Sequence, residues 1–256
     1  MADARVVVAV LGFLPFLAVL LYAIERFISE RREESWGVLV GLVAFLAVGH
    51  AMAEVLFANP FLSAQAGEVF ALFALVAGLL IGMRISWQLV GHPERWRMSV
   101  PTSLAWAGAG LLALHSLGDG LLFGGAFVAP TPEVRVDGLT ITATIVHRLA
   151  EGSLVVLPAL AAGWSLRKSL GALFLGLFLV PGAALTAAIL QPPGSATAFT
   201  LDLAVRSVVA AAEAGFGLLL LLGGLVPQAA ASHRTRWIGW AGIAFIVIAV
   251  VHGIVE

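Results

Sequence analysis

The chain has 256 residues, of which 61% are hydrophobic and only 11% are charged. Soluble domains carry about a quarter charged residues, so this composition is that of an integral membrane protein. A formal net charge of -1 gives no basis for nucleic-acid binding. Because the chain has no cysteine, it has neither disulfides nor thiolate ligands for a metal.

Eight apolar runs approach the roughly 20 residues that a helix needs to cross a bilayer. They predict an all-α protein with one polytopic domain over residues 1–256. The spans are residues 6–24, 37–58, 69–90, 102–127, 139–164, 170–190, 199–226 and 238–255. The first run lacks a small-residue cleavage site and is expected to be retained as a helix. Asn59-Pro60 predicts a turn after the second run. The glycine spacings at 78/82 and 120/124 suit close helix contacts.

Basic residues are concentrated in every second loop. The loops after the first, third, fifth and seventh runs hold ten Lys and Arg residues, whereas the opposite loops hold only Arg5 and Arg135. Cytoplasmic loops of membrane proteins carry the excess of basic residues. We therefore expect a protein of the cell membrane with both termini outside, a fourth helix that runs outward and a fifth that runs inward.

Three runs carry a histidine followed four residues later by a carboxylate: His50 and Glu54, His115 and Asp119, and His147 and Glu151. Residues four apart lie on one face of a helix. Ionisable groups inside a membrane are costly, so repeated pairs need an explanation. Two imidazoles and two carboxylates suit a borderline divalent cation such as zinc. The fourth and fifth runs therefore predict a metal site of His115, Asp119, His147 and Glu151 near the midplane.

A simpler alternative is that each polar group bonds to a neighbour and holds the helices together. Two single residues fit that alternative equally well. His252 lies close to the end of the last run, and Glu213 could pair with Arg206 if the seventh helix bends. The repetition of one spacing on three runs favours the metal site for the paired residues.

The paired runs resemble the signatures of a known family, the ZIP (Zrt/Irt-like) divalent metal transporters. The stretch HSLGDGLLFGGAF resembles the fourth-helix signature, and VHRLAEG resembles the fifth-helix signature. FLAVGHAMAE, ending at Glu54, is similar to the second helix of the family. Gly120 and Gly152 match the glycine that follows each carboxylate. The resemblance implies eight spans with both termini outside, and transport of zinc, iron, manganese or cadmium toward the cytoplasm.

The resemblance also implies roles for single residues. His115, Asp119, His147 and Glu151 fall on the primary ligand positions, and Ser116 on a position that can serve a second metal. His50, Glu54 and Glu213 are expected along the pathway. Arg148 stands where binuclear members carry a carboxylate, and Gly118 and Ala150 replace the usual prolines. We therefore expect one metal, with Arg148 supplying the charge of the second.

Two other functions stay open. An intramembrane zinc hydrolase would use the same ligands with an open position for water, although no HExxH sequence or separate general base is evident. A membrane protein that binds metal without transporting it is the other. We expect a protein that is not an enzyme, with zinc or another divalent cation as transported substrate and bilayer lipid as its other partner. The sequence leaves the metal, the coupling ion and the oligomeric state open, a homodimer included.

Overall fold

The computed structural model describes residues 17, 20–26, 32–128, 138–177, 196–232 and 235–255. These residues are helical apart from short connections, and none of them lies in a strand. Five stretches among them are long and apolar enough to cross a membrane: Glu34–Ala53, Glu68–Val90, Val100–Gly118, Leu203–Ser232 and Arg236–Gly253. They indicate a multi-pass membrane protein, as the composition predicts. Most of the predicted first span and most of the sixth lie outside the described residues.

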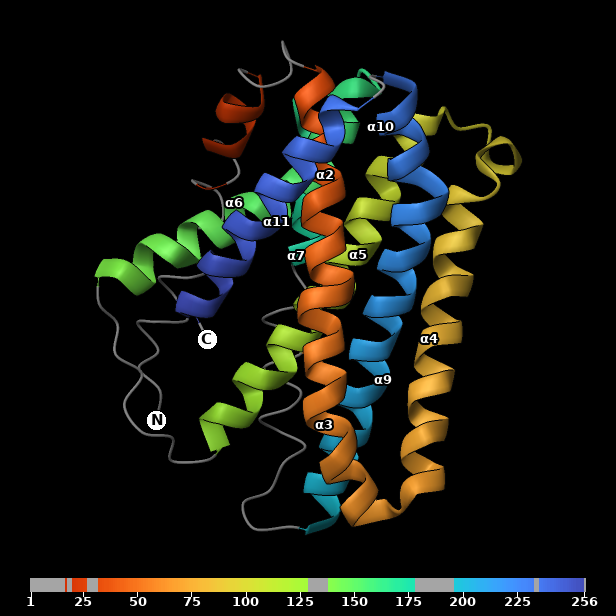
Figure 1. Ribbon diagram of the computed structural model, residues 1–256, viewed down its shortest axis with the longest axis vertical. Coiled ribbons are helices and arrows are strands. Elements are labelled where there is room, and N and C mark those ends of the chain that lie inside the picture. The colour runs from red at the N-terminus through yellow and green to blue at the C-terminus, as the bar shows by residue number, and fades with distance from the viewer. Residues whose placement is uncertain are drawn as a thin grey trace.

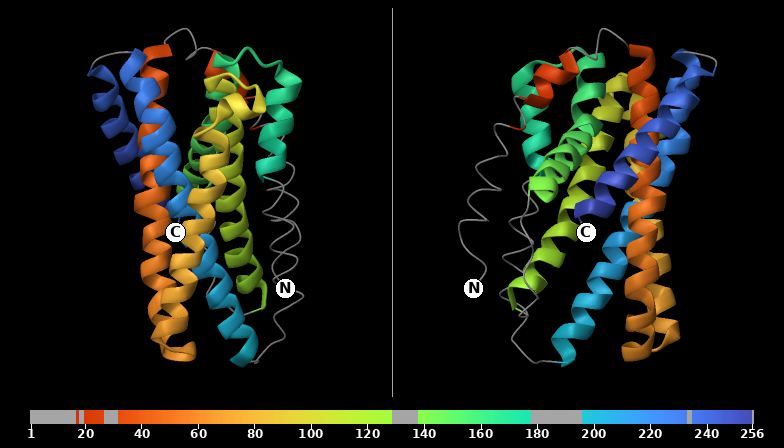
Figure 2. Two further views of the ribbon diagram at one scale, coloured as in Figure 1. Left: turned by 90° about the vertical axis from the view of Figure 1, so that its right-hand side faces the viewer. Right: turned by 60° about the vertical axis from the view of Figure 1, so that its left-hand side comes forward.

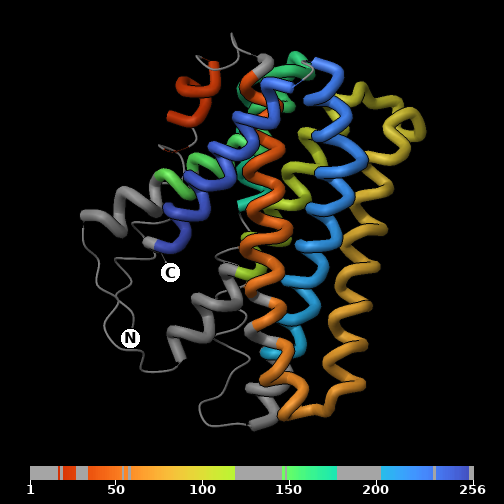
Figure 3. The backbone as a smooth tube through the Cα atoms, in the orientation of Figure 1, coloured from red at the N-terminus to blue at the C-terminus, as the bar shows by residue number. Residues whose placement is uncertain are grey.

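The helices form an elongated bundle (Figure 1). In chain order they are α2 (Arg32–Ala44), the π-helical turn η2 (Phe45–His50), α3 (Ala51–Ala66), α4 (Glu68–Val90), the 3-10 turn η3 (Pro93–Trp96), α5 (Val100–Val128), α6 (Gly138–Ala161), α7 (Leu166–Leu177), α9 (Ala196–Leu220), the π-helical turn η4 (Leu221–Leu225), α10 (Val226–Ser232) and α11 (Arg236–Val255). Segments α2, η2 and α3 make one continuous rod, and α9, η4 and α10 make another (Figure 3).

The predicted turn at Asn59-Pro60 is wrong. Helix α3 continues through Pro60 to Ala66. The chain turns instead at Gly67, whose φ of 92° and ψ of 152° belong to a backbone region that is essentially restricted to glycine. Proline is tolerated inside membrane helices because neighbouring groups can satisfy the freed backbone carbonyl. The rod of α2, η2 and α3 is therefore longer than its sequence pattern predicts.

Small residues let α4 lie directly against α9 (Figure 2). A Cβ atom on Gly78 would come within 2.5 Å of the Val208 carbonyl oxygen, and one on Gly82 would overlap the Ala212 carbonyl. The predicted helix contact at the 78/82 spacing is confirmed, whereas the 120/124 spacing lies outside the described side chains. This contact fixes α9 at the residue next to Glu213.

The main core lies among α2, η2, α5, α6, α9 and α11. Leu39, Val43, Leu111, Leu154 and Phe216 are almost completely buried within it. The outer face of α4 is instead apolar and exposed, with Val69, Leu72 and Phe73 among its residues. Such a face suits contact with lipid, since a soluble surface of this size would be unfavourable.

Basic side chains collect at one end of the bundle. Arg95 and Arg97 lie in and just after η3, Arg167 and Lys168 begin α7, and Arg236 begins α11. Figure 1 places these elements at the upper end, whereas the α3–α4 turn lies at the lower end. The described part of the chain therefore has the charge asymmetry on which the orientation was predicted.

Candidate metal centre

Helices α5 and α6 bring three predicted ligands together. His115 lies on α5, and its Nε2 donates a hydrogen bond of 2.9 Å to Glu151 Oε1 on α6. His147 lies one turn before Glu151, and its Nε2 is 2.5 Å from the same oxygen. His115, His147 and Glu151 each offer a ligand atom within 4.8 Å of the others. They form the first donor group.

The first donor group is shielded from solvent. His115 is fully buried, and Glu151 and His147 are 2% and 5% exposed. A close approach of the two helices allows this, because a Cβ atom on Gly108 of α5 would overlap the Leu154 carbonyl of α6. Burial of two imidazoles and a carboxylate without a cation or full hydrogen bonding is costly.

A second donor group lies on the other edge of the His115 ring. It consists of His50, His115 and Glu213, whose ligand atoms again lie within 4.8 Å of one another. His115 Nδ1 is 3.2 Å from Glu213 Oε1 on α9. The rings of His50 and His115 meet edge to face, with centroids 4.7 Å apart. His115 is therefore shared by both groups.

His252 on α11 completes a cluster of four histidines. Its Nε2 lies 2.9 Å from His50 Nδ1, and its ring stacks on His147 with centroids 5.2 Å apart. Figure 1 shows that α11 ends about half-way along the bundle, which brings the C-terminal turn to this depth. The sequence analysis assigns His252 no metal role, because the residue lies close to the end of the last apolar run.

The π-helical turn η2 ends at His50. Such turns shift the register of the side chains that follow, and they occur often at functional sites. The turn also places Phe45 against His252, with ring centroids 5.2 Å apart. An apolar ring thus packs against the His252 side of the histidine cluster.

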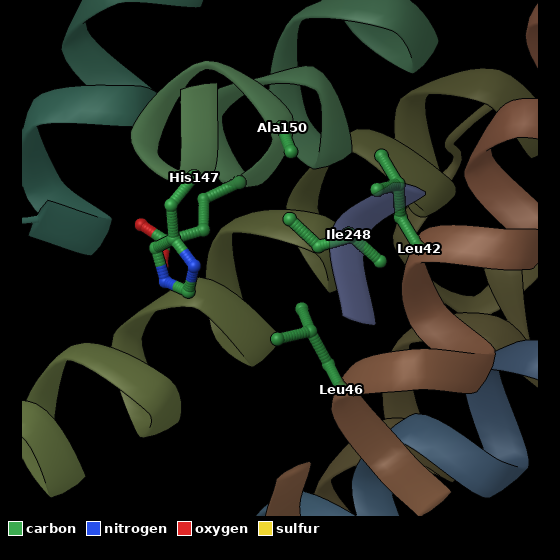
Figure 4. A pocket seen from close by; sticks show the side chains of 6 residues that line it. Leu42, Leu46, His147, Ala150 and Ile248 are labelled. Carbon is green, nitrogen blue, oxygen red and sulfur yellow. The ribbon is translucent and has the colours of Figure 1, made fainter. Parts of the chain in front are cut away.

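A small cavity of about 10 Å³ adjoins the first donor group. His147, Ala150 and Glu151 line it from α6, and Leu42, Leu46 and Ile248 line it from the facing helices. Figure 4 shows the His147 ring reaching from α6 toward the neighbouring helix, beside the apolar side chains of Leu46 and Ile248. The space is at the lower limit for a single water molecule.

Three predicted residues have side chains outside the described part of the structure, although their helices are described. They are Asp119, Arg148 and Glu54. The expected replacement of a second metal by Arg148 therefore stays a prediction. Ser116 is fully buried, and its hydroxyl has no hydrogen-bond partner among the described residues.

The donor chemistry of both groups fits a divalent cation. Zinc binds His nitrogens and carboxylate oxygens at about 2.0–2.2 Å, so two ligands of a tetrahedral ion lie about 3.3 Å apart. The contact between His115 Nδ1 and Glu213 Oε1 is close to that spacing.

Comparison with protein-family models found no matching family, and comparison with curated proteins found no similar sequence.

Proposed function

We propose that the chain is a membrane transporter of divalent cations that moves zinc or a similar ion toward the cytoplasm. The observation that carries the proposal is the buried group of His115, His147 and Glu151 between two apolar helices. Such ligands would replace part of the ion's hydration shell. The resemblance of the fourth and fifth helices to ZIP signatures adds support from the same residues.

The chemistry of the group suits passage of an ion. Conduction requires binding that is favourable enough for entry and weak enough for release. Nitrogen and oxygen donors without thiolates bind zinc reversibly, since the soft cysteine ligands of tight structural sites are absent from the sequence. His115 and Glu151 come from different helices, so a relative movement of α5 and α6 would open the group.

Zinc uptake into proteoliposomes tests the proposal. Glu151→Gln and His147→Gln keep the side-chain size but remove a ligand, and each should lower the initial rate at least about tenfold. Glu94→Gln is the matched control, because Glu94 is an exposed carboxylate in η3. Wild-type rates in the folded Glu151→Gln and His147→Gln proteins would exclude the first donor group from the path.

A zinc hydrolase is the second candidate, because two histidines and one glutamate form the ligand set of some zinc peptidases. The cavity beside the group argues against it. Substrate pockets commonly have about 300–1,000 Å³, whereas this cavity has about 10 Å³. Release of product from a peptide or ester substrate, with no zinc uptake, would favour the hydrolase.

The orientation gives a separate prediction. The chain has no cysteine, so a single introduced thiol is a clean probe. Gln65 lies at the α3–α4 turn and Ser99 lies just before α5 at the basic end, and both are exposed. Gln65→Cys should react with an impermeant maleimide on intact cells, and Ser99→Cys only after permeabilisation, because basic ends face the cytoplasm. The reverse labelling would overturn the inward direction of transport.

A further inference from the structure

The His115 ring contacts a carboxylate on each of its two edges. A neutral ring that carries its proton on Nε2, toward Glu151, has an acceptor at Nδ1. That nitrogen lies 3.2 Å from Glu213 Oε1, which is also an acceptor when the carboxylate is ionised. In that state the two acceptors repel each other unless a proton or a metal cation lies between them.

Glu213 needs such a partner. The residue is 2% exposed, and its Oε1 makes no hydrogen bond among the described residues. The contact with His115 has the spacing of two ligands on one ion but lacks the geometry of a hydrogen bond. A buried charge without compensation is strongly unfavourable, so the surroundings of Oε1 favour a bound cation.

His50 supplies the third donor and is held in place from behind. Its Nδ1 lies 2.9 Å from His252 Nε2, and its ring meets the His115 ring edge to face. Histidine ligands of metals commonly have their second nitrogen fixed by another group, which sets the ring orientation. His252 therefore acts as a positioning residue for His50.

We infer that His50, His115 Nδ1 and Glu213 Oε1 form a second divalent-cation position. It lies between the η2–α3 rod, α5 and α9, and it differs from the Arg148 position to which the ZIP resemblance assigns a second ion. The ion would occupy the two positions one after the other during transport, so the physiological meaning of the inference rests on the proposed transport function.

The shared ring explains how an ion would pass between the positions. A neutral imidazole has one lone pair, so His115 binds a cation on one edge while its N–H faces the carboxylate on the other. An ion that moves across the ring exchanges Glu151 for Glu213 as its carboxylate ligand.

Paired substitutions separate the two positions. His147→Gln with Glu151→Gln removes the first donor group, and His50→Gln with Glu213→Gln removes the second. Zinc per protein is measured by elemental analysis after dialysis against the same free zinc, for proteins that stay monodisperse and helical. Each double variant should retain about one zinc, and the quadruple variant should bind less than a tenth of that.

The outcomes distinguish this inference from the proposed function. If zinc disappears from the His147→Gln, Glu151→Gln protein and persists when His50 and Glu213 are replaced, the second position does not exist and the first stands. The opposite result supports the second position and removes the first. If neither double variant binds zinc, both positions fail.

A cysteine introduced as a sulfur ligand gives a second test, which reads the Zn–S bond and not the amount of zinc in the paired variants. His50→Cys combined with Glu151→Gln puts the only thiol of the chain at the inferred position. Zinc X-ray absorption should then show a Zn–S distance of about 2.3 Å. Ala51→Cys with Glu151→Gln is the control, because Ala51 is equally buried but one residue further along the helix. Bound zinc without sulfur in the folded His50→Cys protein would overturn the inference.

Discussion

Replacing His115 by alanine should weaken zinc binding at both donor groups at once. His115 is the described side chain that faces both Glu151 and Glu213, at 2.9 Å and 3.2 Å. Its loss removes one ligand from each group and leaves two buried carboxylates to be satisfied by other means. We expect zinc affinity, measured by equilibrium dialysis, to fall at least about tenfold, and uptake into proteoliposomes to fall with it.

His92→Ala is the matched control for this substitution. His92 lies in the loop before η3, where it contacts the exposed Glu94 at 3.2 Å and its ring meets the Trp87 ring edge to face. Its removal should leave binding and uptake unchanged. Undiminished zinc binding by a folded His115→Ala protein would mean that the histidines serve to hold the helices together, which is the simpler alternative for these buried polar groups.

The first donor group could be predicted in part from sequence, because one of its two His–Glu contacts lies within a single helix. His147 and Glu151 are one helical turn apart, so their contact follows from the α-helix itself. The same local argument paired His115 with Asp119 and His50 with Glu54, whose carboxylates lie outside the described side chains. Bringing α5 against α6 needs tertiary packing, and there the prediction depended on the repeated donor pairs and on the opposite directions expected of the two runs.

The second donor group had no comparable local signal. Glu213 meets His115 because α9 packs against α4 and α5, and His252 meets His50 because α11 ends at the depth of η2. The π-helical register of η2, which ends at His50, does not follow from periodicity at 3.6 residues per turn. Sequence reasoning could only place Glu213 on the pathway and leave His252 as a lone polar residue.

The Pro60 turn failed for a similar reason. Proline often marks a helix boundary, because it removes one backbone hydrogen bond and its ring clashes with the preceding turn. In a membrane helix neighbouring groups can satisfy the freed carbonyl, and here the helix continues to a glycine that adopts a positive φ. The apolar run itself gave no means of choosing between Pro60 and Gly67 as the end of the rod.

The close approach of α5 and α6 makes Gly108 a second position of large effect. Gly108 lies about two turns before His115 on the same face of α5, and it packs on the backbone of Leu154, just beyond Glu151 on α6. A leucine at this position has to push α6 away, since the group it meets is a backbone carbonyl. Gly108→Leu should therefore lower the unfolding temperature in detergent, at a cost of about 1–3 kcal/mol or more, and weaken zinc binding about tenfold.

Gly171→Leu on α7 is the control for added bulk in a helix. A Cβ atom there meets nothing within 4 Å, so the substitution should change neither the unfolding temperature nor zinc binding. The two measurements on Gly108→Leu should move together, because one displacement of α6 breaks the packing and separates His115 from Glu151. Full zinc affinity in a destabilised Gly108→Leu protein would show that zinc binding does not depend on the contact between α5 and α6.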